Sequence, residues 1–195
     1  MRKTFIVIAA FATAGSLIIS SCNSNRQNSA NAAIMDSASL VKRGAYLVTI
    51  MGCDDCHSPK RMGPNGPEII PELRLSGFQH DGKQPPIDTN QVRNGWAMLS
   101  PDLTSAVGPW GASFAGNITS DNSGIGTWSE EQFTTALRKG KLKGMENGRG
   151  LLPPMPWFNY KNLEDNDIKA IYAFLKTTKP VNNVVPAPKA FADLK

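Results

Sequence analysis

Cys53-Asp54-Asp55-Cys56-His57 is the stretch of sequence that decides how the rest of the chain folds. Two thiols three positions apart, followed at once by an imidazole, are typical of a site where c-type haem is attached. Thiols at this spacing can add to the two vinyl groups on one edge of a haem, and His57 then lies where it can supply a nitrogen ligand to the iron. The motif predicts one covalent haem c, with Cys53 and Cys56 as its thioether anchors.

Three other interpretations of this motif stay open at this point. A thioredoxin-like redox pair needs a β-α-β pattern around it, and the sequence does not display one. A zinc site would have to combine the motif with the distant His80, because the chain has only three cysteines and two histidines. A disulfide between Cys53 and Cys56 would be unusual at so tight a spacing without a redox role.

The first 21 residues have the pattern of an export signal. A basic start is followed by an apolar stretch over residues 5–19, which is shorter than the roughly 20 residues that a membrane span needs. Ile19-Ser20-Ser21-Cys22 also resembles the lipobox of bacterial lipoproteins, in which the cysteine is acylated and becomes the first mature residue. We therefore predict a lipoprotein signal peptide over 1–21 with lipid on Cys22. The alternative is an ordinary signal peptide that leaves Cys22 as a free thiol.

Composition places few restrictions on the part of the chain after the signal. The formal net charge is +5, and it falls to about +3 without the basic start. No basic run or aromatic-basic stripe suggests that the protein binds nucleic acid. Residues 22–36 are small and polar, which predicts a flexible tether. The remaining length is enough for one domain with a buried core, and the 14 prolines and 17 glycines predict long, turn-rich connections.

Three segments have the signals of helices. Residues 36–51 carry an apolar face of moderate clarity and end before Gly52. Residues 130–139 follow a capping box formed by Ser129 and Gln132, and Gly140 ends them. Residues 164–177 have acidic residues in the first turn and an apolar face at helical spacing.

The segment 58–115 shows no clear regular structure, because prolines and glycines interrupt it throughout. A loop this long is uncommon in a compact domain. We expect it to wrap over a cofactor, which would supply part of the core. His80 lies in this segment between polar neighbours, and we expect a solvated side chain there rather than an iron ligand.

Met155 is the candidate for the second axial ligand. It stands between prolines in the apolar stretch 151–157, and its thioether sulfur is a soft ligand that suits haem iron opposite a histidine. A core-filling methionine is the alternative. Three further methionines compete for the role: Met62, Met98 and Met145.

The order of these features resembles a class I cytochrome c domain: a helix, C-x-x-C-H, a long loop, a methionine and a last helix. The resemblance covers about residues 40–181, and its details are similar to the cytochrome c subunits of bacterial membrane-bound alcohol and gluconate dehydrogenases. Those details are Arg43-Gly44-Ala45-Tyr46-Leu47, the 117–128 segment, Pro154-Met155-Pro156 and the 167–175 segment. Those subunits usually carry three haem domains, whereas this chain has one.

The resemblance implies an all-α cytochrome c fold, with few helices around one haem and long Pro/Gly-rich loops. It gives a domain over 37–181, followed by a Pro-rich tail over 182–195. It also implies that the two terminal helices cross closely, with Gly44 meeting aromatic side chains. The candidates for this crossing are Tyr46, Tyr172 and Phe174.

The family also holds the Nδ1–H of its proximal histidine with a proline carbonyl. Pro64 is the first candidate for that role here, with Pro59 and Pro67 behind it. Nearness in sequence suggests three residues that could hydrogen-bond a haem propionate: Arg149, Trp157 and Tyr160.

These inferences predict a lipid-anchored, single-haem electron carrier outside the cytoplasmic membrane. His57 and Met155 would keep the iron six-coordinate, and no residue of the chain would make or break substrate bonds. The expected partners are redox proteins, such as a membrane dehydrogenase, an oxidase or another cytochrome, and the membrane itself. The alternatives are a five-coordinate haem sensor or peroxidase-like protein, or an obligate haem subunit of a dehydrogenase or oxidase complex.

Overall fold

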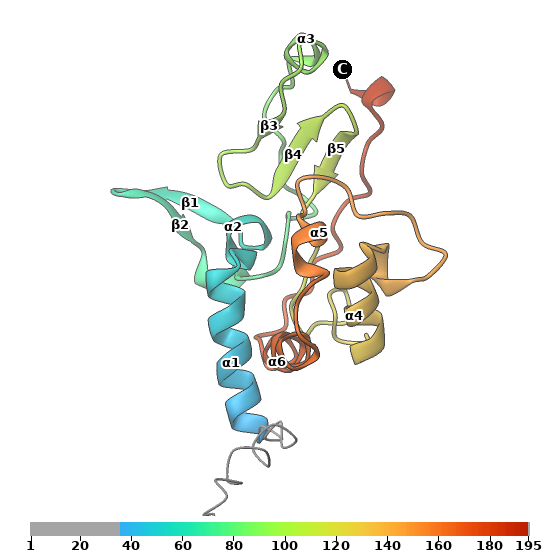
Figure 1. The fold of residues 1–195 in the computed structure, drawn as a ribbon. Coiled ribbons are helices and arrows are strands. Elements are labelled where there is room, and N and C mark those ends of the chain that lie inside the picture. The colour runs from blue at the N-terminus through green and yellow to red at the C-terminus, as the bar shows by residue number, and fades with distance from the viewer. Residues whose placement is uncertain (1–35, 195) are drawn as a thin grey trace, which may run out of the picture. The chain divides into compact units, whose positions relative to one another are not determined.

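The computed structural model describes residues 36–194, and this part of the chain contains both helices and strands (Figure 1). The helices are α1 (Ser37–Ile50), α2 (Cys53–His57), α3 (Thr89–Arg93), α4 (Glu130–Lys139), α5 (Trp157–Tyr160) and α6 (Asp165–Leu175). The strands are β1 (Lys60–Gly63), β2 (Gly66–Ile69), β3 (Met98–Leu99), β4 (Ser105–Gly108) and β5 (Gly111–Phe114). Short 3-10 turns are η1 (Pro71–Leu73), η2 (Leu142–Gly144) and η3 (Phe191–Asp193). The prediction of an all-α fold is therefore wrong, because two antiparallel sheets accompany the helices.

Helices α1 and α6 pack against each other through a glycine. Asp36 starts α1 by accepting a hydrogen bond from the backbone N–H of Ser39 at 3.0 Å. A Cβ atom on Gly44, in the middle of the helix, would lie only 1.9 Å from the carbonyl oxygen of Ala170 in α6. Glycine costs helix stability, but here it lets the two backbones touch. Figure 1 shows α6 end-on beside α1.

Of the aromatic residues expected at this crossing, Phe174 does lie against Gly44. The expectation is wrong for the two tyrosines. Tyr46 is 55% exposed, and Tyr172 donates its hydroxyl to the carbonyl of Trp128 at 2.7 Å. Each tyrosine is two positions from a contact residue of the crossing, and side chains two positions apart on a helix point to nearly opposite sides.

Helix α4 begins and ends where the sequence predicts. Ser129 accepts a hydrogen bond from the backbone N–H of Gln132 at 3.1 Å, and the Gln132 side chain accepts one from the backbone N–H of Ser129 at 2.9 Å. Gly140 ends the helix in the left-handed conformation, with a φ of 61°. The side chains that α4 buries include Phe133 and Leu137.

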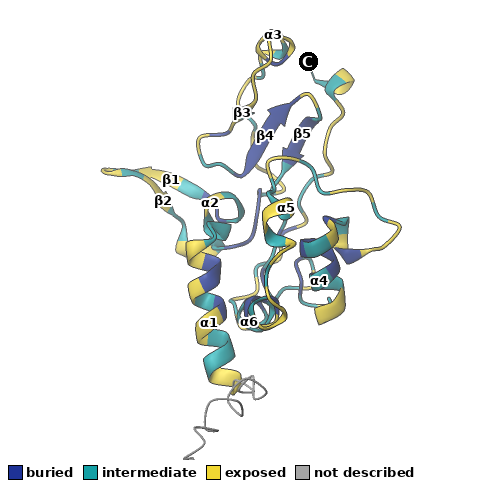
Figure 2. Cartoon of the chain, viewed as in Figure 1, coloured by how far each residue is buried: buried dark blue, intermediate teal, exposed yellow. Residues whose placement is uncertain are grey.

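The main core joins α1, α4 and α6, and Figure 2 shows the buried faces of these helices. Helix α6 is shorter than predicted, because it ends at Leu175 rather than 177. The buried members of this core are Leu47, Val48, Leu75, Ile125, Phe133, Leu137, Ile168, Ala170, Ile171 and Leu175. Burial of such aliphatic and aromatic side chains is the main favourable term in folding.

The segment 58–115 forms strands where the sequence predicts none. Strand β1 pairs with β2 as a hairpin, and β4 lies between β3 and β5 in a second antiparallel sheet. Figure 2 shows that β4 and β5 are largely buried. Strands of two to four residues are too short for an alternating pattern to show in the sequence, and β4 and β5 are also rich in Gly, Ser and Ala.

A second apolar cluster covers this sheet and is built partly by the C-terminal residues. Its buried members are Val92, Val107 and Ala112, and Phe191 and Leu194 pack against them. Ala112 and Lys189 pair across an antiparallel bridge, with N···O distances of 2.9 and 3.0 Å. The last residues of the chain are therefore held against β5.

No helix among residues 36–194 is long and apolar enough to cross a membrane. The predicted signal peptide over 1–21, the lipidated Cys22 and nearly all of the predicted tether over 22–36 lie outside the described residues.

Candidate haem-binding site

The motif residues Cys53, Cys56 and His57 lie together on the single turn of α2. Gly52 precedes the turn in the left-handed conformation, with a φ of 69°, so it separates α2 from α1. Both thiols are free and partly exposed. Residues three apart lie on the same side of a helix, so the two sulfur atoms can face one edge of a planar group.

The His57 ring is oriented by a backbone carbonyl from a distant part of the chain. Its Nδ1 lies 2.7 Å from the carbonyl oxygen of Gly116. A carbonyl can only accept, so Nδ1 carries the proton and the lone pair is left on Nε2, which is the tautomer that a metal ligand needs. Burial lowers the pKa of His57 and favours the neutral ring, although the bond to Gly116 acts in the opposite direction.

The prediction that Pro64 supplies this carbonyl is wrong, and neither Pro59 nor Pro67 supplies it. Pro64 lies in the turn between β1 and β2. The acceptor comes instead from the stretch after β5.

Gly77 makes the contact between His57 and Gly116 possible. Its backbone N–H donates to the carbonyl of His57 at 2.8 Å. Its φ is 74°, and a Cβ atom there would lie 2.6 Å from the carbonyl oxygen of Gly116. Only glycine fits a left-handed position so close to another backbone.

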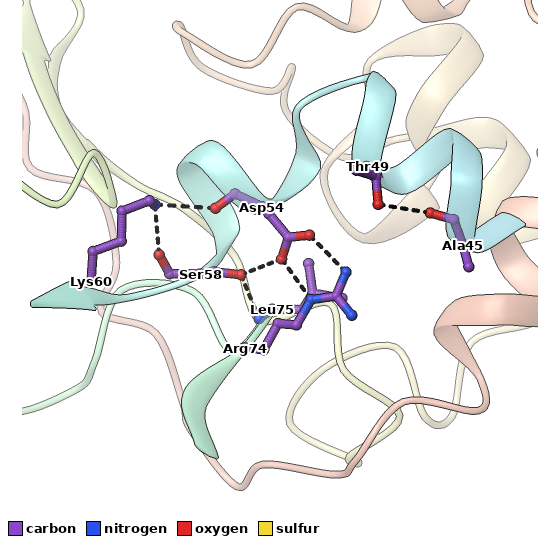
Figure 3. Close-up of polar contacts among 7 residues, drawn as sticks. All are labelled: Ala45, Thr49, Asp54, Ser58, Lys60, Arg74 and Leu75. Atoms are coloured by element: carbon purple, nitrogen blue, oxygen red, sulfur yellow. Dashed lines mark hydrogen bonds and ion pairs between the residues drawn. The ribbon is translucent and has the colours of Figure 1, made fainter. Parts of the chain in front are cut away.

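Asp54 ties the haem motif to the segment after β2 (Figure 3). Its carboxylate accepts from the Arg74 guanidinium at 2.7 and 3.0 Å and from the Ser58 hydroxyl at 2.7 Å. Ser58 is fully buried, and its hydroxyl also accepts from the backbone N–H of Leu75 at 2.9 Å. Burial opposes ionisation of Asp54, but the bonds from Arg74 and Ser58 outweigh it and lower the pKa of the carboxyl.

Lys60 caps the C-terminal end of α2. Its ammonium donates to the carbonyls of Asp54, Asp55 and Ser58 at 2.7–3.1 Å, and to that of Asp102 at 3.2 Å. A cation at a helix C-terminus is favourable because unpaired carbonyls gather there. Lys60 therefore joins the motif helix to the β3–β4 turn.

Met155 packs against the main core, as does Cys53 of the motif. Met62 and Met145, two of the three competing methionines, are 72% and 56% exposed, and Met98 packs on the second cluster instead. These contacts favour Met155 among the four candidates. Met51 also packs on the main core, although nothing in the sequence marked it as a candidate.

Comparison with known proteins agrees with this arrangement. The sequence model of the cytochrome c family matches residues 41–179, which is most of the chain. The chain belongs to the cytochrome c family. Members bind haem c covalently, and the pair of free cysteines followed by His57 fits that chemistry.

Several curated proteins resemble this cytochrome. The fructose dehydrogenase cytochrome subunit of Gluconobacter japonicus is 31% identical over 151 residues, or 76% of this chain and 23% of that protein. The gluconate 2-dehydrogenase cytochrome c subunit of Pantoea cypripedii is 32% identical over 155 residues, or 79% and 25%. The quinone-type alcohol dehydrogenase cytochrome c subunit of Gluconobacter oxydans is 32% identical over 144 residues, or 73% and 22%. The cytochrome thus spans about a quarter of the length of these relatives.

The alternatives to haem at this motif gain no support from the structure. All strand pairs in the described part of the cytochrome are antiparallel, so the β-α-β unit of a thioredoxin-like protein does not occur there. Residues 36–194 contain no group of three or more His, Cys, Asp or Glu side chains that could hold a metal ion, as a zinc site would need. The thiols of Cys53 and Cys56 are not joined.

Before haem is attached, the surroundings of Cys53 and Cys56 disfavour the thiolate form of both side chains. Burial, followed by the nearby charge of Asp54, raises the pKa of Cys53 to about 11. Burial also raises the pKa of Cys56. A neutral thiol is a weak nucleophile, so these groups resist unassisted reaction.

The residues suggested for the haem propionates have different surroundings. Arg149 is exposed and donates to the carbonyl of Gly150 at 2.8 Å. Trp157 is partly buried, and its ring covers Gly140 so closely that a Cβ there would lie 2.4 Å from it. Tyr160 donates its hydroxyl to the carbonyl of Met51 at 3.0 Å, so this group already has a partner.

The residues that sequence reasoning missed are Gly116, Lys60 and the Asp54–Arg74 pair. Each of them acts through a contact between segments that lie apart in the chain or through a backbone carbonyl. These two kinds of contact leave no pattern in the sequence. His80, by contrast, is exposed as expected.

Proposed function

We propose that this cytochrome carries one electron at a time on a single haem c outside the cytoplasmic membrane. His57 and Met155 are the two axial ligands in this proposal, and Cys53 and Cys56 are the covalent anchors. The observation that carries it is the hydrogen bond from His57 Nδ1 to Gly116, because it leaves Nε2 free to bind iron.

Bound haem supplies a reversible one-electron couple. The residues of the chain hold it in place and set its potential. Two protein ligands in both redox states leave no open position for a substrate, which suits electron transfer rather than catalysis. The partly buried Met155 would place a thioether against an apolar core, and that arrangement raises the potential.

Optical spectra with and without carbon monoxide test the axial ligands. Under this proposal we expect the wild-type protein to be low-spin and not to bind carbon monoxide. We expect the Met155→Ala variant to be high-spin and to bind carbon monoxide. Met145→Ala serves as a matched control because that side chain is exposed, and Met51→Ala serves as a second because that side chain packs on the same core. A wild-type protein that readily binds carbon monoxide would instead favour a five-coordinate sensor or peroxidase.

The resemblance to dehydrogenase subunits supports a redox protein as the partner. The matched relatives are named as cytochrome subunits of fructose, gluconate and alcohol dehydrogenases. We propose that this cytochrome takes electrons from, or gives them to, a membrane-associated oxidoreductase, either as a shuttle or as a bound subunit. Co-purification in mild detergent distinguishes the two forms: a bound subunit stays with its partner through gel filtration, and a shuttle does not.

The N-terminal pattern supports export and a lipid anchor. We propose that residues 1–21 are removed, that Cys22 is acylated, and that residues 22–36 tether the domain over 37–181 to a membrane, with 182–195 as its tail. Mass spectrometry of the mature N-terminus tests this, because an acylated cysteine adds the mass of its lipid. A Cys22→Ser variant should lose that mass and leave the membrane fraction.

A further inference from the structure

Asn183 is a buried polar residue that lies beyond the region matched by the cytochrome c family model. The residue is only 2% exposed, and its side chain makes three hydrogen bonds to the segment 76–80. Nδ2 donates to the carbonyls of Ser76 and Phe78 at 2.8 and 2.9 Å, and Oδ1 accepts from the backbone N–H of His80 at 3.0 Å. Two acceptors and one donor match the two ends of a single amide group.

The backbone of Asn183 is itself fixed from the opposite side. Its N–H donates to the Ser123 hydroxyl at 2.9 Å. The Asn117 side chain donates to the carbonyl of Asn183 at 3.2 Å and to that of Val181 at 2.8 Å. The C-terminal segment is therefore held between the loop around 76–80 and the loop around 117–123.

The two carbonyls that Asn183 holds flank Gly77, the residue that meets the His57 site. Gly77 donates to the backbone carbonyl of His57 at 2.8 Å and lies against the peptide of Gly116. Gly116 in turn accepts the hydrogen bond from the His57 ring. One buried amide thus fixes a segment that touches both the backbone of His57 and the acceptor of its ring.

We propose that Asn183 is a positioning residue for His57, through Gly77 and Gly116, and that it helps to set the reduction potential of the haem. This rests on the proposed role of His57 as an axial ligand. A strong Nδ1–H···O bond makes an imidazole a better donor to its metal, which stabilises the ferric state. If Asn183 is removed, the bond loosens, the ferric state loses stabilisation and the potential rises.

Asn182 provides a matched control, because the same side chain stands next to Asn183 but is exposed. The experiment compares holoprotein with Asn183→Ala and with Asn182→Ala. Two quantities are measured: the reduction potential, and the rate at which the His57 Nδ1 proton exchanges with solvent in NMR spectra. Asn183→Ala should raise the potential. It should also speed exchange of the Nδ1 proton by about tenfold, which corresponds to weakening the His57–Gly116 bond by roughly the net worth of one hydrogen bond. Asn182→Ala should leave both at the wild-type values.

Wild-type values of both quantities in folded Asn183→Ala would overturn the inference while leaving the proposed function intact. A wild-type protein without haem, or without histidine ligation, would overturn the proposed function itself. If Asn183→Ala does not fold, Asn183→Asp carries the test, since it keeps the size and the oxygen that accepts from His80. Only its exchange rate is compared, because a buried charge itself shifts the potential. Faster exchange supports the inference, and unchanged exchange overturns it.

Discussion

Arg74 and Asp54 form a two-pronged ion pair, in which Nε and Nη2 of the guanidinium meet the two carboxylate oxygens at 3.0 and 2.7 Å. Asp54 lies inside the haem motif and its side chain is 14% exposed, whereas that of Arg74 is 41% exposed. The Arg74 guanidinium also lies 5.8 Å from the centre of the Phe174 ring in α6. A single side chain therefore connects the motif helix to the last helix, and Figure 3 shows its contact with Asp54.

Replacing Arg74 should destabilise the protein. Arg74→Ala leaves the partly buried carboxylate of Asp54 without its main partner, at a cost of about 1–3 kcal/mol in the free energy of unfolding. Urea unfolding of the holoprotein measures this cost. Arg61→Ala is the control, because that arginine is exposed on β1, and it should change stability by less than about 0.5 kcal/mol. Equal losses in the two variants would contradict a specific role for the pair.

The same pair predicts how stability depends on pH. Because the folded protein lowers the pKa of Asp54, its contribution is fully present above the ordinary carboxyl pKa of about 3.9 and is lost as the pH falls through the lower folded value. The wild type should exceed Asp54→Asn in stability at pH 7, and the gap should shrink below about pH 4. Urea titrations at several pH values test this. A gap that stays constant down to pH 2 would rule out the ionised pair as its source.

Gly44→Ala should loosen the contact between α1 and α6. A Cβ atom at this position would clash with the Ala170 carbonyl, and overpacking of this kind typically costs about 1–3 kcal/mol, more than the roughly 1 kcal/mol that alanine gains in helix propensity. Thermal unfolding measures the net loss. Lys42→Ala, at an exposed position of the same helix, should be nearly neutral. A stabilised Gly44→Ala protein would show that the two helices can move apart freely.

Lys60→Met should weaken the C-terminal end of the motif helix. The substitution keeps the length of the side chain but removes an ammonium that donates to four carbonyls, at a cost of about 1–3 kcal/mol. Lys83→Met, at an exposed loop position, is the control. Denaturant unfolding and the yield of haem-loaded protein are both informative, since α2 carries the proposed attachment residues. Identical results for the two lysines would leave Lys60 without a structural role.

Local signals in the sequence predicted the three long helices α1, α4 and α6, but not the short helices α2, α3 and α5. Ser129 and Gln132 fix the start of α4 by hydrogen bonds within four residues, and Gly140 fixes its end. Such short-range chemistry can be recognised without any knowledge of the rest of the fold. Gly44 was also recognisable, because a glycine inside a helix needs a close neighbour to justify it.

The sequence failed where structure depends on contacts between distant segments. The strands of 58–115 hold few residues each, and the sheet of β3, β4 and β5 packs on a small cluster that includes Phe191 and Leu194 from the far end of the chain. The acceptor for His57 came from Gly116, a residue without a side chain, so no side-chain pattern could mark it. The register of such contacts follows from the assembled fold rather than from neighbouring residues.

The hydrogen bonds from Asn183 to the segment around Gly77 join residues that are synthesised at different times. The chain emerges from its N-terminus, so Cys53, Cys56 and His57 leave the ribosome well before Asn183 does. Until that residue arrives, the segment beside His57 lacks its three amide bonds. A chain whose C-terminal segment has not yet docked therefore lacks part of the frame that surrounds the thiols and the imidazole.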